Sequence, residues 1–329
     1  MTGAVTHFPD VLRLDPEAET ARIVAAIRHQ VPQVLKRHGV VLGLSGGIDS
    51  SVCAALCVRA LGPSRVLGLF MPDRESAGES LVLGRRLAAG LGMETALEEI
   101  GPILEASGCY RRRNAAIRMV VPEYGDGWKE KLVIASATSA YAIFHLVVES
   151  PDGNRRKVRL TRESYLGIVA AMNFKQRTRK MMEYYHADRL TYAVVGTPNR
   201  LEYDQGFFVK GGDGAADLKP IAHLYKSQVY QLAEHLEIPE EIRRRPPTTD
   251  TYSLAQSQEE FYFTLPYRQM DLCLYGRDHG LPPEAIAEGA GLTTEQVKRA
   301  YLDIESKRRA TRYLHLSPLL VRDGEGAEL

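Results

Sequence analysis

A turn rich in glycine and serine, placed between two apolar segments, offers the clearest chemistry in the sequence. It reads Ser-Gly-Gly-Ile-Asp-Ser at residues 45–50 and directly follows the apolar run Val40–Leu44. We expect this run to be a buried strand and the residues from the turn to about Leu61 to be a helix. Gly46 and Gly47 allow a tight bend, and the free N–H groups at the start of a helix attract anions. The turn therefore predicts a phosphate-binding loop.

Two common phosphate-binding patterns do not fit this turn. No lysine follows the glycines, as a mononucleotide P-loop requires, and the G-x-G-x-x-G spacing of dinucleotide folds is absent. Instead the turn resembles the SGGxDS pyrophosphate loop of the N-type ATP pyrophosphatases, with Ser45, Ser50 and Ser51 as hydroxyl donors. Enzymes of that superfamily cleave ATP between its α and β phosphates and use the AMP to activate an oxygen. The alternative is an ordinary glycine-rich connection between a strand and a helix.

The bulk properties of the chain are those of an ordinary globular enzyme. Its 329 residues are 44% hydrophobic and 25% charged, with a formal net charge of +1. A net charge this close to zero gives no overall electrostatic attraction to nucleic acid or to a membrane surface. No apolar run reaches the length of a membrane span, and the N-terminus lacks the pattern of a secretion signal. The four cysteines form no C-x-x-C pair, so no zinc or redox site is indicated and a cytoplasmic location is expected.

The order of apolar runs predicts an α/β fold, a doubly wound and mostly parallel sheet with helices on both faces. The expected elements are strands at Val40–Leu44, Val66–Met71 and Tyr192–Gly196, and helices at about 16–38, 79–91 and 176–185. Apolar strands that alternate with helices are typical of such sheets, which bind ligands at the carboxyl ends of their strands. We expect a single domain over residues 1–329, with an inserted β-hairpin at about 144–160 and a helical C-terminal region at about 258–312.

Further motifs, in order along the chain, narrow the resemblance to the NAD synthases. They resemble that family's N-x-K-x-R-x-R-M segment, its G-T-x-N-x-x-E segment, its long G-[FY]-x-x-K signature ending in A-D-[LI]-x-P, its lysine-bearing turn and its P-T-A-D segment. The corresponding residues are 173–181, 196–202, 206–220, 224–228 and 246–250. The resemblance runs from about residue 20 to 315 with the hairpin set aside, and it implies an adenine nucleotide alpha hydrolase-like fold.

This resemblance implies a reaction. NAD synthase adenylates the carboxylate of deamido-NAD (nicotinic acid adenine dinucleotide), and ammonia then displaces AMP to give NAD. Because a carboxylate must approach a phosphate, cations have to neutralise several negative charges. Mg²⁺ suits this task, and Asp49 and Glu202 are the carboxylates expected to hold it. Lys226 is expected to stabilise charge on the ATP phosphates during the transfer.

The resemblance also implies separate contacts for the two substrates. The residues expected to bind ATP are Ser45, Gly46, Gly47, Asp49, Ser50, Thr197, Lys226 and Thr248. Those expected to bind deamido-NAD are Asn173, Arg177, Lys210 and Asp217. The expected catalytic residues are Asp49, Lys210, Asp213, Asp217 and Lys226. Asp213 and Asp217 would help to deprotonate the incoming ammonium.

Several of these residues also have a simpler interpretation. Asp49 can cap the helix that follows it, and Glu202 can be a solvated helix residue. Asp213 lies in a Gly-Gly-Asp-Gly turn, where aspartate is common for local reasons. We expect Arg179 and Lys180 to lie on an exposed basic face.

The chain departs from the short ammonia-dependent enzymes in its C-terminal region. Residues 305–311 lack the His-Lys pair that these enzymes often carry, which leaves the roles of Lys307 and Arg308 open. The chain has no room for a glutaminase domain, which would need roughly 250 further residues. Free ammonia, or ammonia from a separate subunit, is therefore the expected nitrogen donor. A homodimer is implied by the resemblance alone.

Two other functions compete with this reading. The first is a related ligase that amidates a different carboxylate; tRNA modification would need a basic groove or paired cysteines, which the sequence lacks. The second is DNA binding, because residues 283–301 have the helix–Gly turn–helix cadence of a DNA-reading motif. The near-neutral chain argues against nucleic acid as a partner.

Overall fold

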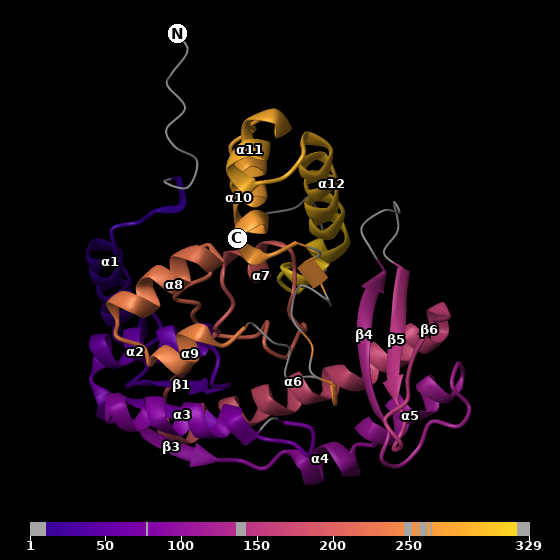
Figure 1. Ribbon diagram of the computed structural model, residues 1–329. Helices are drawn as coiled ribbons and strands as arrows, with labels where there is room; N and C mark the ends of the chain where they lie inside the picture. Colours follow the sequence, from indigo (N-terminus) through magenta and orange to yellow (C-terminus); the bar gives the residue numbers. More distant parts are fainter. Residues whose placement is uncertain are drawn as a thin grey trace.

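A four-stranded parallel sheet forms the centre of the structure (Figure 1). The computed structural model describes residues 11–76, 78–135, 143–246, 252–254, 256, 262–263 and 265–320. The strands, in spatial order, are β3 (Glu94–Leu97), β2 (Val66–Phe70), β1 (Val40–Gly43) and β7 (Ala193–Val194). Val40 of β1 pairs with Val66 of β2 and with Ala193 of β7. The apolar runs expected as buried strands therefore lie side by side at the core.

Helices cover both faces of this sheet, which confirms the expected doubly wound fold. Successive residues of a strand point to opposite faces, and Val40 and Leu42 join one hydrophobic cluster while Val41 joins another. The covering helices are α1 (Pro16–His29), α2 (Ile48–Leu61), α3 (Gly78–Leu91) and α8 (Lys226–His235) on one side, and α4 (Gly101–Ala106), α5 (Cys109–Arg118) and α6 (Arg162–Leu190) on the other.

The first predicted helix is shorter than expected. The sequence pattern predicts a helix over about 16–38, whereas α1 ends at His29 and one π-helical turn covers Gln30–Val34. Pro32 lies within that turn and has no backbone N–H, so the regular hydrogen-bond ladder of an α-helix is interrupted there.

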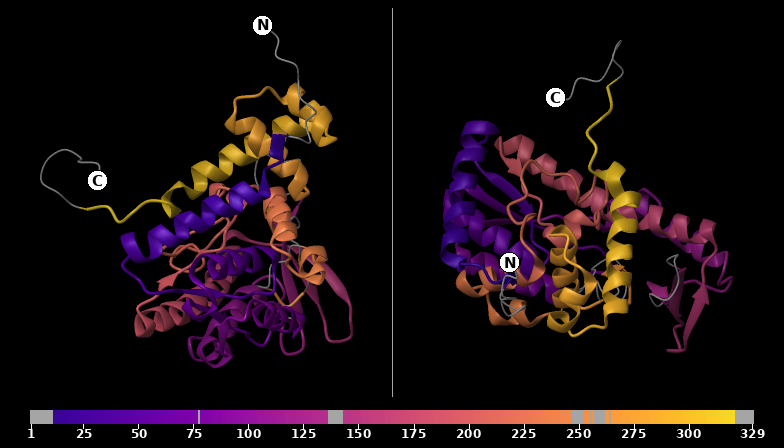
Figure 2. Two further views of the ribbon diagram at one scale, coloured as in Figure 1. Left: turned by 90° about the vertical axis from the view of Figure 1, so that its left-hand side faces the viewer. Right: turned by 90° about the horizontal axis from the view of Figure 1, so that it is seen from above.

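A second sheet of three antiparallel strands lies at the far end of α6 from the parallel sheet (Figures 1 and 2). Its strands, in spatial order, are β4 (Lys129–Ala135), β5 (Ile143–Glu149) and β6 (Arg155–Arg159). The expected hairpin is confirmed as β5 and β6, with Glu149 paired to Arg155. The sequence did not predict β4, because this strand begins with three charged residues, which do not show the alternation of a half-buried strand.

The C-terminal helices form a layer with its own hydrophobic core, centred on Met270, Leu274, Ile286 and Val297. The helices of this layer are α7 (Arg200–Asp204), α10 (Tyr267–Asp278), α11 (Pro283–Ala290) and α12 (Thr294–Thr311), whereas α9 (Glu240–Arg244) packs beside α8 in the core of the parallel sheet. The expected helical character of the region is confirmed.

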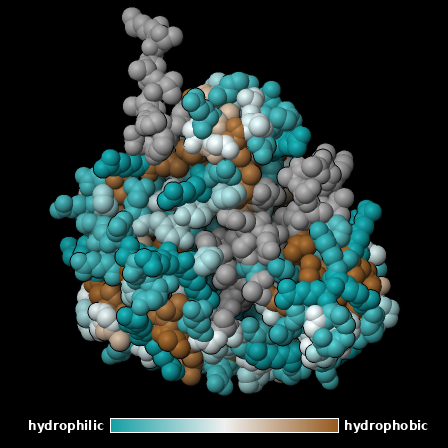
Figure 3. All heavy atoms as spheres, viewed as in Figure 1, coloured by the Kyte–Doolittle hydropathy of each residue, from teal (hydrophilic) through white to brown (hydrophobic). Residues whose placement is uncertain are grey.

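The face of the molecule seen in Figure 3 is mainly hydrophilic. Within the described residues, no helix combines the length and the apolar character required to cross a membrane.

Candidate active site

The glycine-rich turn lies at the carboxyl end of β1 and leads directly into α2. Gly46 has a φ of 70°, in the left-handed region that favours glycine. A Cβ built on Gly46 would lie 2.4 Å from the backbone oxygen of Ser80 in α3, so no side chain fits there without a backbone shift. Gly47 is the N-cap of α2 and makes no side-chain cap. The first N–H groups of α2 can therefore bind a ligand.

The serines of the turn hold its shape. The Ser50 hydroxyl donates to the backbone oxygen of Gly47 at 3.0 Å and lies 3.1 Å from the Ser45 hydroxyl. Ser51 is fully buried and donates to the same Gly47 oxygen at 2.8 Å. Ser45 and Ser50 line the neighbouring cavity, whereas Ser51 does not. Ser51 therefore supports the loop from within the core.

A cavity of about 560 Å³ lies beside the turn. This volume is typical of a small-molecule site. Its walls come from the carboxyl ends of β1, β2 and β7, from one face of α6 and from the C-terminal layer. The predicted site residues on its lining are Ser45, Gly47, Asp49, Ser50, Asn173, Arg177, Thr197, Glu202, Lys210, Asp213 and Lys226. The fold thus gathers residues from distant parts of the sequence into one cavity.

Asp49, Glu202 and Lys226 on the cavity wall form one connected polar cluster with Asn199, which is buried and does not line the cavity. Lys226 Nζ, 2% exposed, forms an ion pair with Asp49 Oδ2. Asn199 Nδ2 donates to Asp49 Oδ1 at 3.0 Å. Asn199 and Glu202 also form the capping box of α7, in which Glu202 Oε2 accepts from the Asn199 backbone N at 3.2 Å. Asn199 therefore joins the two carboxylates that the sequence assigned to Mg²⁺.

These contacts bear on the simpler interpretations of both carboxylates. Asp49 lies in the first turn of α2, but its carboxylate contacts Asn199 and Lys226, which belong to other elements. Glu202 is 9% exposed, so it is not a solvated helix residue. Both carboxylates line the cavity.

Lys226 is held in its position and in its charged state. Burial by itself would lower the pKa of Lys226, but the carboxylates of Asp49 and Glu202 outweigh burial and raise this pKa above its ordinary value. Asp271 of α10 accepts hydrogen bonds from the backbone N of Lys226 at 3.3 Å and of Ser227 at 2.7 Å. Burial raises the pKa of Asp271 to about 6. A carboxylate from another helix thus anchors the start of α8.

The donor set near the loop suits a magnesium ion shared with ATP. Mg²⁺ is usually bound through one or two carboxylates together with phosphate oxygens and water. Asp49 and Glu202 provide two carboxylates beside the phosphate-binding turn. The residues present therefore fit this ion.

One face of α6 forms a wall of the cavity. Asn173 and Arg177, one helical turn apart, lie on this wall as expected for contacts with a second substrate. Arg177 is exposed, and its Nε donates to the backbone oxygen of Lys210 at 3.3 Å.

The expectation that Arg179 and Lys180 lie on an exposed basic face is wrong. Lys180 is 5% exposed and forms an ion pair with Glu183 at 2.6 Å. Arg179 forms an ion pair with the buried carboxylate of Asp73 at 3.1 Å. A local pattern of basic residues cannot show that carboxylates neutralise them after folding.

Lys210 and Asp213 line the cavity on the segment that follows α7. Lys210 Nζ donates to the backbone oxygen of Tyr313 at 2.9 Å, which ties this segment to the C-terminal layer. Asp213 Oδ1 accepts from the backbone N of Val209 at 2.7 Å, so Asp213 also has the local turn role that its glycine-rich context suggests. Burial raises the pKa of Asp213.

The structure separates Asp217 from the other predicted site residues. Asp217 is exposed, does not line the cavity, and accepts a hydrogen bond from the backbone N of Val194 at 2.7 Å. The geometry therefore gives no support to its predicted contact with the second substrate. Thr248 lies outside the described residues.

Lys307 and Arg308 serve the packing of the C-terminal layer. Lys307 Nζ donates to the backbone oxygen of Tyr262 at 2.6 Å. Arg308 forms ion pairs with Asp204 at 2.7 Å and with Asp278 at 2.6 Å. Neither residue lines the cavity.

Comparison with known proteins establishes the family. The family model for NAD synthase matches residues 19–121 and 155–313. The chain belongs to the NAD synthase family. A relative from Mesorhizobium japonicum, an NH(3)-dependent NAD(+) synthetase, is 64% identical over 312 residues, which cover 94% of this chain and 98% of the relative. The NH(3)-dependent NAD(+) synthetase of Rhizobium meliloti is 62% identical over 321 residues, which cover 97% and 96%.

Solved structures of similar proteins share the fold. An NMN synthetase from Francisella tularensis aligns with a TM-score of 0.66 at 22% identity, covering 94% of this chain and 100% of that one. An NH3-dependent NAD synthetase from Campylobacter jejuni aligns with a TM-score of 0.59 at 23% identity, with the same coverage. At these identities the likeness concerns the fold alone.

Two residues that hold lining residues in place, without lining the cavity themselves, were missed by the sequence analysis. Asn199 is the asparagine of the G-T-x-N-x-x-E segment. The motif therefore includes this residue, but the sequence analysis gave it no role. Asp271 lies within α10 and acts on the start of another helix, so nothing in its sequence neighbourhood indicates its role.

Proposed function

We propose that this member of the NAD synthase family converts deamido-NAD, ATP and ammonia to NAD, AMP and diphosphate. The observation that carries the proposal is the cluster of Asp49, Glu202 and Lys226 beside a phosphate-binding turn, in the cavity that Asn173 and Arg177 also line. The names of the relatives with more than 60% identity support the same reaction.

The first step transfers the adenylyl group. A carboxylate oxygen of the acceptor attacks the α-phosphorus of ATP, and the bond from this phosphorus to the oxygen that bridges to the β-phosphate breaks. The N–H groups at the start of α2 are placed to bind the departing diphosphate, and Lys226 offsets its negative charge. Mg²⁺ supplies further charge neutralisation when bound, and Asp49 and Glu202 are the residues that would hold it.

The second step forms the amide. The nitrogen of ammonia attacks the acyl carbon of the adenylated acceptor, the bond from this carbon to the AMP oxygen breaks, and the nitrogen loses a proton. Asp213 lines the cavity, and the rise in its pKa through burial makes its carboxylate a better proton acceptor. Asp213 is therefore our candidate for the base in this step.

We further propose free ammonia as the nitrogen donor, a homodimer as the assembly and the cytoplasm as the location, with residues 1–329 as one domain. The four cysteines are free and buried, which suits a reducing compartment. Sedimentation equilibrium of the purified protein tests the dimer. Replacement of ammonium by glutamine in the assay tests the nitrogen donor, because activity with glutamine would require a glutaminase.

The decisive experiment incubates the purified protein with ATP, Mg²⁺, ammonium and deamido-NAD and measures NAD, AMP and diphosphate by liquid chromatography. Equal amounts of the three products are expected. Asp49→Asn is a matched control, because it keeps the side-chain volume and removes the charge. Amidation of nicotinic acid mononucleotide but not of deamido-NAD would show a different acceptor, and the absence of AMP with either would contradict the proposal.

The contacts of the C-terminal helices do not favour DNA binding. Lys298 pairs with Glu284 at 3.9 Å, and Arg299 pairs with Glu295 at 3.5 Å. Basic side chains of α12, the helix that would contact DNA, thus have acidic partners on the protein itself. This pairing leaves less positive charge to bind DNA phosphates.

A further inference from the structure

The segment that follows β2 forms part of the cavity wall beside the phosphate-binding turn. Pro72 and Ser76 line the cavity, at the carboxyl end of the strand that pairs with β1. Helix α3 comes next in the chain, and its Ser80 packs against the phosphate-binding turn, because a Cβ built on Gly46 would lie 2.4 Å from the Ser80 backbone oxygen. The 72–76 segment therefore lies at the end of the cavity where the phosphates of ATP are expected.

The 72–76 segment is folded as a tight turn that hydrogen bonds close from within. The backbone N of Ser76 donates to the backbone oxygen of Asp73 at 3.1 Å, and the backbone N of Glu75 donates to Asp73 Oδ1 at 2.8 Å. The Ser76 hydroxyl accepts from the backbone N of Asp73 at 3.0 Å. Because this hydroxyl accepts here, its own proton can be donated to a ligand in the cavity.

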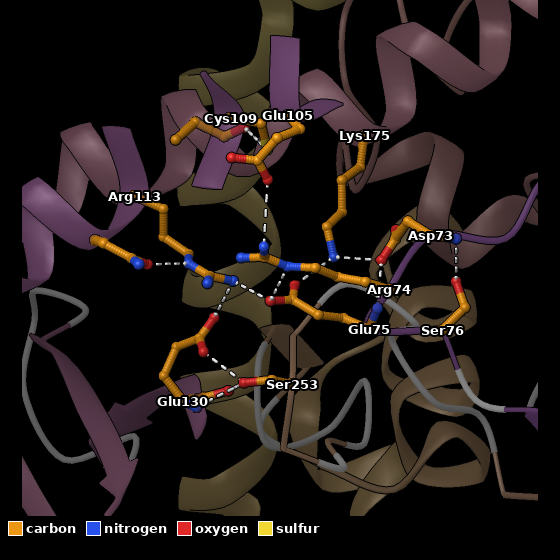
Figure 4. A network of polar contacts seen from close by, with 12 residues as sticks. Asp73, Arg74, Glu75, Ser76, Glu105, Cys109, Arg113, Glu130, Lys175 and Ser253 are labelled. Atoms are coloured by element: carbon orange, nitrogen blue, oxygen red, sulfur yellow. Dashed lines mark hydrogen bonds and ion pairs between the residues drawn. The ribbon is translucent and has the colours of Figure 1, made fainter. Parts of the chain in front are cut away.

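The acidic side chains of this segment lie in a buried group of cations, behind the cavity wall (Figure 4). Neither Asp73 nor Glu75 lines the cavity. The Asp73 side chain is fully buried and pairs with Lys175 of α6 at 3.3 Å and with Arg179 at 3.1 Å. Glu75 pairs with the same Lys175 at 2.7 Å and with Arg113 of α5 at 2.6 Å. Two helices thus hold the segment from behind.

A residue outside the family pattern extends this group of charges. The match to the NAD synthase model stops at residue 121 and resumes at 155, so β4 belongs to the unmatched part of the chain. Glu130 of β4 is fully buried and accepts from Arg113 at 3.1 Å. The same Arg113 nitrogen, Nη1, therefore contacts one carboxylate of the three-stranded sheet and one of the 72–76 segment.

Glu75 stays ionised in these surroundings. Burial by itself would raise the pKa of Glu75, but the positive charges of Lys175 and Arg113 outweigh burial and hold this pKa below its ordinary value. Buried ion pairs are screened little by solvent and salt. The contacts of Glu75 therefore keep the 72–76 segment in one position against α5 and α6.

We propose that Glu75 is a positioning residue for ATP, which together with Arg113 and Lys175 holds the 72–76 segment so that the Ser76 hydroxyl meets the nucleotide. The proposal rests on the function proposed above, since it takes ATP to occupy the end of the cavity beside the phosphate-binding turn. Glu75 does not reach the cavity and acts through the segment that it holds. Strand β4, outside the family pattern, thereby contributes to ATP binding through Arg113.

The test is a double-mutant cycle that measures the Kd for ATP with Mg²⁺ present, by isothermal titration calorimetry without an acceptor. Ser76→Ala is expected to raise this Kd roughly 2- to 10-fold, the range that corresponds to the loss of one hydrogen bond. Glu75→Gln keeps the side-chain volume, removes the charge and is expected to raise the Kd by a similar factor. In a Ser76→Ala background, Glu75→Gln is expected to have no further effect, because the hydroxyl that Glu75 positions is already absent.

Two further variants keep the test decisive. Glu149→Gln is a matched control with the same chemical change, because Glu149 pairs with Arg155 and does not line the cavity; the wild-type Kd is expected. Arg113→Lys keeps a positive charge beside Glu75 but loses the planar guanidinium, and it serves if Glu75→Gln does not fold. This variant is also expected to raise the Kd for ATP, and to do so only while Ser76 is present.

Three results would overturn the proposal. They are an unchanged Kd for ATP in Glu75→Gln, losses that multiply in the double variant, and an equal rise in the KM for deamido-NAD, which is expected to stay at its wild-type value. Because ATP binding is measured without an acceptor, the failure of this proposal is distinguishable from the failure of the proposed function, which NAD formation by wild type decides.

Discussion

Gly46 offers the sharpest test of the loop geometry. A Gly46→Ala side chain would impose two separate costs. The φ of 70° disfavours any residue with a Cβ by about 1–2 kcal/mol. The new Cβ would lie 2.4 Å from the backbone oxygen of Ser80, and forced overpacking of this kind costs about 1–3 kcal/mol. We therefore expect Gly46→Ala to lose about 2–5 kcal/mol of stability if the loop keeps its shape.

Two other glycines separate these costs. Gly291 has a φ of 63° and no neighbour within 4 Å of a built Cβ. Gly291→Ala is therefore destabilised by the backbone conformation alone. Gly47 has a φ of −92°, and its built Cβ would meet the Ser45 hydroxyl at 3.2 Å. Gly47→Ala is therefore expected to keep most of the stability. Because Gly47 lines the cavity, the same substitution is expected to weaken ATP binding.

The assay measures the midpoint of denaturant unfolding and the kcat/KM for ATP from AMP release. If the loop moves instead of storing the strain, a shift of its backbone by about 1 Å is expected to lower kcat/KM for ATP on the order of 100-fold. Gly46→Ala should thus be the least stable of the three variants or the most impaired in kcat/KM. Stability equal to that of Gly291→Ala together with wild-type kcat/KM would refute this account of the loop.

Three further predictions concern the polar cluster and its anchor. Lys226→Met should lower kcat/KM for ATP by about 100- to 1,000-fold, as expected when one preorganised donor is removed, and steady-state kinetics with near-normal activity would contradict this role. Glu202→Gln should shift the Mg²⁺ dependence of activity to higher concentration, and an unchanged midpoint in a Mg²⁺ titration would exclude Glu202 as a ligand. Asp271 has its pKa raised from 3.8 to about 6, so the stability from its protonation is complete below pH 3.8 and is lost as the pH rises through 6. Between pH 4 and 7, wild type should lose about 2 kcal/mol relative to Asp271→Asn, and parallel stability curves for the two proteins would show that the titration belongs to another group.

The sequence alone determined the parts of the site that depend on neighbouring residues. The bend at Gly46 and Gly47, the strand before it and the helix after it follow from local apolar pattern and backbone freedom. The resemblance to NAD synthases, expected from ordered motifs, was confirmed by the family match. The hairpin at β5 and β6 was also visible, because a polar turn separates two short strands.

Only the tertiary structure decided which charges meet. Asp49 and Lys226 are far apart in the sequence, yet they form one ion pair, and Asp271 anchors the backbone that carries Lys226. Asp217 belongs to a motif but lies away from the cavity, and Lys180 looked exposed but is buried. Burial, ion pairing and pKa depend on groups that approach through space, so their outcome is set when the elements pack and cannot be derived from the order of residues along the chain.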